Sequence, residues 1–276
     1  MTHSDSIHSR RKFLLNSSAV SLAAFLPKEL DAQSAAPQRS DNGSPIFATT
    51  PKDTSLKFTP EGVRRPFAGN TLICHLPQQS KVRDKIAALG DALHSSSFAH
   101  KLGLLPSDSY HMTVFPGAND QDRASYGWPA DISIDAPMSG CNRIVGERIA
   151  NFRMSEKLPI RVKVDLEKTL GPQRVSSLRI SPADDRENAK LRNLRDRMAK
   201  EVFRFRTSDH ATYGFHVSLA YQMKPLSREE AREHQAILNH HVPGIIAVAP
   251  VIELGIPEFC TFDDMFRFEI CALLQT

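Results

Sequence analysis

The sequence lacks an internal apolar run that approaches the roughly 20 residues a membrane-spanning helix needs. Its four cysteines show no C-x-x-C spacing, which argues against a zinc site and a disulfide-dense scaffold. The net charge of +4 with neutral histidines is small, so the concentrated basic surface of a duplex-DNA-binding protein is not expected. The remaining picture is an ordinary globular chain of 276 residues, 41% hydrophobic, with enough apolar material to bury a core.

Familiar cofactor and catalytic motifs are also missing. The sequence contains no GxGxxG, P-loop, G-x-S-x-G or H-E-x-x-H pattern. Their absence disfavours dinucleotide-cofactor enzymes, P-loop enzymes, serine hydrolases and zinc proteases. Any catalytic function must therefore come from another arrangement of side chains.

Residues 1–36 resemble a twin-arginine export signal. The paired Arg10 and Arg11 precede a weakly apolar stretch over 14–26, and an alanine-rich segment over 32–36 offers a cleavage site. A basic amphipathic helix or a plain anchor is the alternative. We expect a periplasmic or secreted protein that uses the twin-arginine export machinery and is not stably inserted in the membrane. Residues 37–67, rich in Pro, Ser and Asn without periodicity, are interpreted as an irregular linker.

Residues 68–276 are predicted to form one domain with an internal repeat, whose two halves span about 68–170 and 171–276. Each half has the predicted order strand, helix, strand, helix, strand. The predicted strands are 71–76, 110–115, 160–166, 175–180 and 215–221; the predicted helices are 80–93, 139–152, 184–202 and 227–240; apolar runs follow at 245–256 and 262–273. Cys74 and Cys271 lie in predicted core strands, where buried free thiols are expected, although an oxidising compartment permits a disulfide.

Two histidines occupy matching strands of the two halves. Because side chains alternate along a strand, His111 shares a face with Thr113, and His216 shares a face with Ser218. Two such strands would place two imidazoles across one cleft, where one acts as base and the other as acid near neutral pH. The neighbouring hydroxyls would donate hydrogen bonds to phosphate oxygens. The pattern therefore favours in-line attack on a phosphodiester.

Other interpretations of these histidines stay open. His94 and His210 are also followed two positions later by Ser or Thr, so the tripeptide alone carries little information. The two strand histidines could make structural hydrogen bonds only. They could instead bind a metal together with a carboxylate such as Asp209, as in a metal-dependent hydrolase.

The motifs His-Met-Thr-Val at 111–114 and His-Val-Ser-Leu at 216–219 resemble the paired H-x-[ST]-hydrophobic motifs of the 2H phosphoesterase superfamily. The sequence is similar to a branch described only as a domain of unknown function, over about residues 68–274. The resemblance implies a bilobal α+β fold with two concave antiparallel sheets facing across a cleft and helices outside. It also implies His111 and His216 as the acid–base pair, Thr113 and Ser218 as phosphate ligands, and no metal or cofactor.

The function expected from these features is a metal-independent phosphodiesterase or cyclic phosphodiesterase, a monomer acting on a nucleotide or short RNA phosphodiester. A non-catalytic nucleotide or phosphate-ester binding protein using the same cleft is the alternative. Arg179 and Tyr221 are further candidate substrate-binding residues, although strict alternation places Tyr221 on the buried face with Leu219. The cluster Arg192, Arg195 and Arg197 is predicted on the outer surface of a helix, and the pair His240-His241 at a helix end.

Overall fold

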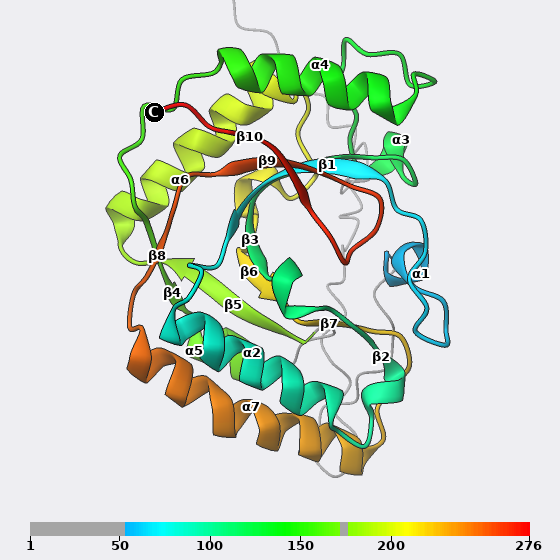
Figure 1. Cartoon of the computed structure of the whole chain (residues 1–276), viewed down its shortest axis with the longest axis vertical. Helices are drawn as coiled ribbons and strands as arrows, with labels where there is room; N and C mark the ends of the chain where they lie inside the picture. Colours follow the sequence, from blue (N-terminus) through cyan, green and yellow to red (C-terminus); the bar gives the residue numbers. More distant parts are fainter. Residues whose placement is uncertain (1–52, 172–175) are drawn as a thin grey trace, which may run out of the picture. The chain divides into compact units, whose positions relative to one another are not determined.

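The computed structural model describes residues 53–171 and 176–276 (Figure 1). The predicted export signal at 1–36 and the predicted linker up to residue 52 lie outside the described residues. None of the described helices is long and apolar enough to cross a membrane.

The main element of the fold is one eight-stranded antiparallel sheet with the strand order β10-β9-β1-β3-β6-β5-β4-β8. The strands are β1 (Gly69–His75), β3 (His111–Asn119), β4 (Ile160–Val164), β5 (Ser177–Pro182), β6 (His216–Ser218), β8 (Ile252–Leu254), β9 (Glu258–Phe262) and β10 (Glu269–Leu273). A separate pair joins β2 (Leu102–Leu104) to β7 (Ala220–Gln222). The predicted α+β class is confirmed, and the two expected sheets are halves of one sheet, joined where Met112 of β3 pairs with Val217 of β6.

Four longer helices cover this sheet. They are α2 (Lys81–His94), α4 (Met138–Asn151), α6 (Asp185–Arg197) and α7 (Arg228–Val248), with short helices at α1 (Thr54–Lys57), α3 (Arg123–Tyr126) and α5 (Leu166–Leu170). The helices α2 and α7 run side by side (Figure 1), whereas α4 packs on β1, β9 and β10, and α6 packs on β3, β4 and β5. The core lies between these helices and the apolar face of the sheet.

The helix starts follow from local sequence. The Ser80 hydroxyl accepts a hydrogen bond from the Arg83 amide at the start of α2, and Ser227 with Glu230 forms a complete capping box at the start of α7. Helix α7 continues past its predicted end and contains Pro243. Packing of its buried apolar stripe outweighs the lost backbone hydrogen bond, so His240 and His241 lie within the helix and the helix-end prediction is wrong.

Residues 53–67, interpreted from composition as part of a linker, pack against the sheet. Phe58 is only 2% exposed, and its ring lies 5.4 Å from the ring of Tyr221. A side chain on Gly103 would meet the Phe58 ring at 2.8 Å, so glycine is needed where β2 passes over it. An aromatic residue therefore anchors this segment beside the motif strands.

The cysteines differ in burial. Cys74, Cys141 and Cys260 are buried free thiols, as expected for strand and helix residues facing the core. Cys271 is exposed, so its predicted burial is wrong. It lies on β10, an edge strand whose pairing with β9 shifts register between Ile270 and Ala272, and most of its side chains face solvent.

Candidate active site

The two motif strands are neighbours in the sheet. Antiparallel pairing of Met112 with Val217 sets His111 across from Ser218 and Thr113 across from His216. In each strand the motif residues are half-buried and the residue between them is buried. The two imidazoles and two hydroxyls therefore lie on one face, in a diagonal arrangement that neither half could make alone.

Both imidazoles are oriented by the same backbone contact. Nδ1 of His111 donates to the Ser109 carbonyl at 2.6 Å, and Nδ1 of His216 donates to the Gly214 carbonyl at 3.0 Å. Each acceptor lies two residues before its histidine. Because a carbonyl oxygen only accepts, each neutral ring carries its proton on Nδ1 and keeps a lone pair on Nε2.

Burial keeps both rings neutral. It lowers the pKa of His111 to about 3, with the neighbouring His75 and His216 acting in the same direction. Burial also lowers the pKa of His216, assisted by the positive charges of Arg179 and Lys57. In its neutral form either ring can act as a general base, and a bound phosphate anion would favour protonation of its partner.

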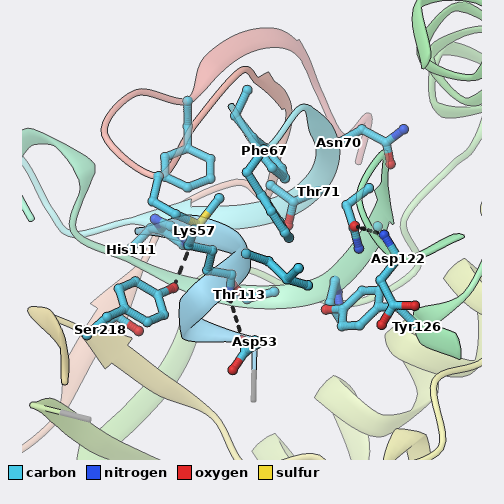
Figure 2. A pocket seen from close by; sticks show the side chains of 18 of the residues that line it. Asp53, Lys57, Phe67, Asn70, Thr71, His111, Thr113, Asp122, Tyr126 and Ser218 are labelled. Carbon is cyan, nitrogen blue, oxygen red and sulfur yellow. Dashed lines mark hydrogen bonds and ion pairs between the residues drawn. The ribbon is translucent and has the colours of Figure 1, made fainter. Parts of the chain in front are cut away.

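All four motif side chains line one pocket of about 230 Å³. Figure 2 shows His111, Thr113 and Ser218 around it, together with Asp53 and Lys57 from the segment before β1. Aromatic rings also line the pocket, and the centre of the Phe268 ring lies 4.4 Å from that of the His111 ring. The four predicted motif residues thus line the same pocket.

Of the two further candidate substrate-binding residues, Tyr221 lines the pocket and Arg179 does not. Arg179 pairs with His216 between β5 and β6 and acts on it electrostatically, but it is not among the residues that line the pocket. Tyr221 does line the pocket.

A β-bulge explains the position of Tyr221. The amides of Leu219 and Ala220 both donate to the Ser176 carbonyl, so two residues oppose one, and both are buried. The extra residue reverses the alternation and turns Tyr221 to the side of Ser218. The expectation from strict alternation, which placed Tyr221 with Leu219, is therefore wrong.

The position of Arg195 also differs from the one predicted, which was the outer surface of a helix. Its side chain is 1% exposed, so the predicted surface position is wrong for this residue. One guanidinium nitrogen donates to the Val114 carbonyl at 2.6 Å, and the group stacks over the Tyr213 ring at 4.1 Å. Tyr213 in turn lines the same pocket as Thr113, and burial raises the pKa of Tyr213 to about 12. Arg195 thus ties the first motif strand to the segment that leads into the second.

Sequence reasoning missed several residues of the pocket. Asp53 and Lys57 were not predicted as site residues because the composition of their segment is typical of a linker. Tyr213 was not predicted because it lies outside both motifs. The only local signal was Phe58 within that polar segment. As for metals, the described part of the chain contains no group of three or more His, Cys, Asp or Glu residues that could hold an ion.

Residues 57–171 match the family model 2H-phosphodiest, described as a domain of unknown function (DUF1868). Over this range the chain resembles a 2H phosphoesterase. The predicted resemblance is confirmed, and the match supports a phosphodiesterase-type function at the level of the family. The matched range includes His111 but not His216, so the second half of the 2H site is defined here by the sheet register and the shared pocket.

A solved structure of similar architecture covers most of the chain. The crystal structure of a conserved protein of unknown function from Agrobacterium tumefaciens is similar, with a TM-score of 0.74 and 27% sequence identity. The similarity covers 86% of this chain and 97% of that one. No curated protein matches the sequence.

Proposed function

We propose that this protein is a metal-independent phosphodiesterase or cyclic phosphodiesterase that acts on a nucleotide or short RNA phosphodiester. One observation carries the proposal: two imidazoles, one from each half of the chain, line the same pocket and hold their protons on Nδ1 through equivalent carbonyl contacts. Each faces a motif hydroxyl on the adjacent strand. Paired proton carriers around an anion site suit phosphodiester cleavage.

The reaction needs one proton taken and one delivered. Nε2 of one histidine accepts the proton of the attacking water or 2′-hydroxyl as the new P–O bond forms. The other histidine, protonated when the phosphate anion is bound, donates its proton to the leaving oxygen as the old P–O bond breaks. The hydroxyls of Thr113 and Ser218 donate hydrogen bonds to the non-bridging oxygens. Opening of a 2′,3′-cyclic phosphate by water then yields a phosphomonoester and a free hydroxyl.

A substrate panel tests this proposal. The purified chain is incubated with 2′,3′-cyclic nucleotides and with 2′-5′- and 3′-5′-linked dinucleotides, with and without EDTA. We expect hydrolysis of at least one cyclic nucleotide at a rate that the chelator leaves unchanged. Binding by calorimetry with no product would instead support a binding protein, and loss of turnover in EDTA would contradict metal independence.

We also propose that residues 1–36 direct export through the twin-arginine machinery. The support is the sequence pattern around Arg10 and Arg11. Replacing both residues with lysine is expected to abolish export because the receptor reads the arginine pair. Fractionation of cells expressing the full chain checks this: equal amounts of both forms outside the cytoplasm would contradict the proposal.

A further inference from the structure

The candidate site has an unusual charge pattern. Among the described residues that line the pocket, Lys57 is the only lysine or arginine, while Asp53 and Asp122 are carboxylates. Burial lowers the pKa of His111 and of His216 and so favours their neutral forms. Thr113 and Ser218 offer dipoles rather than charges. A phosphodiester that enters this pocket therefore meets one full positive charge, that of Lys57.

Lys57 is held in place on several sides. Its ammonium group lies 2.7 Å from an Asp53 carboxylate oxygen, 4.8 Å from the centre of the Tyr221 ring and 5.3 Å from that of Phe67. The side chain is 14% exposed. The next residue, Phe58, is buried against Tyr221 and fixes the backbone. The cation is thus positioned before any ligand binds, which reduces the entropy lost on binding.

The surroundings favour the charged form of this amine. Burial opposes the charge, but the nearby Tyr221 and Asp53 raise the pKa of Lys57 above its ordinary value. The same charge acts on His216 and helps to keep that imidazole neutral. Lys57 is therefore close enough to the second motif to affect an anion bound there.

We propose that Lys57, which lies outside both H-x-[ST] motifs, is the cationic group that binds the substrate phosphate, together with Thr113 and Ser218. This inference rests on the proposed function for the identity of the ligand, a phosphodiester anion. Lys57 contacts a non-bridging oxygen in the ground state as well as during the reaction. It therefore affects KM more than kcat.

The experiment compares three lysine variants in the full chain. Lys57→Met keeps the length and the apolar contacts with Phe67 and Tyr221 but removes the charge. Lys57→Arg restores a cation with a different shape. Lys101→Met is the matched control, because Lys101 forms a partly buried ion pair with Glu230 at 2.6 Å and does not line the pocket. Thermal denaturation of each variant verifies the fold.

With a cyclic nucleotide that the wild type hydrolyses, Lys57→Met is expected to raise KM by about 10- to 100-fold, as for loss of a hydrogen bond from a charged donor. Lys57→Arg should recover a substantial part of this loss, and Lys101→Met should leave KM within about twofold. Rising salt should increase KM for the wild type more than for Lys57→Met. An unchanged KM in a folded Lys57→Met variant would overturn the inference while leaving the proposed function intact.

Binding without turnover separates the two proposals. Calorimetry with inorganic phosphate and with adenosine 2′-phosphate measures anion affinity directly. If no diester is hydrolysed but Lys57→Met still weakens anion binding by about tenfold or more, Lys57 is the anion-binding cation and the phosphodiesterase proposal fails. If Lys57→Met binds both anions as tightly as the wild type does, the role of Lys57 is refuted whatever the activity.

Discussion

Replacing either His111 or His216 with alanine is expected to lower kcat for a cyclic nucleotide by about 100- to 10,000-fold, the usual contribution of general acid–base catalysis. Each imidazole has its Nδ1 committed to a backbone carbonyl, so neither can take over the task of the other from its own strand. Initial rates at saturating substrate measure the effect. The double variant should lose little more than the poorer single variant, because the two groups act in one step.

His94→Ala is the matched control for this experiment. His94 belongs to the same H-x-[ST] tripeptide pattern but lies exposed at the end of α2, outside the pocket. We expect its kcat to equal that of the wild type. Full activity in folded His111→Ala and His216→Ala variants would refute the acid–base assignment, and circular dichroism verifies that each variant is folded.

Arg195→Ala is expected to reduce the free energy of unfolding by about 3–5 kcal/mol. The substitution leaves a cavity where the largest fully buried side chain was, and it removes the donor at 2.6 Å from the Val114 carbonyl. Tyr213 also loses the cation stacked on its ring at 4.1 Å. Urea denaturation followed by circular dichroism measures the change.

The effect should extend to the site, because Tyr213 lines the pocket together with Thr113. We expect kcat to fall under conditions where Arg195→Ala is still fully folded. The control is Arg186→Ala, on the exposed face of the same helix, where a change within about 0.5 kcal/mol is expected. Equal stabilities for the two variants would show that Arg195 does not tie the strands together.

Local periodicity was enough to predict much of this fold. The period-two pattern correctly placed His111 with Thr113 and His216 with Ser218 on one face of each strand, with Met112 and Val217 buried between them. The helix starts were predictable because capping depends on residues within one turn of each other. Such features depend on neighbours in sequence, so the sequence reports them directly.

Residues that act through distant contacts were not predictable in this way. Arg195 sits in a charged helical pattern typical of a surface, and only packing against Tyr213 and Val114 explains its burial. Tyr221 faces the pocket because the amides of Leu219 and Ala220 share the carbonyl of Ser176, the residue before β5. Lys57 belongs to a polar segment whose position depends on the burial of Phe58.

The sequence by itself determined the two motifs and the face that each motif presents, because alternation along a strand is a local property. Only the tertiary structure decided that β3 and β6 are adjacent, and that His111 lies across from Ser218 and Thr113 across from His216. It also decided that Lys57, a lysine from outside both motifs, lies in the same pocket. Pairing between strands about a hundred residues apart depends on the packing of the whole core, which no local pattern records.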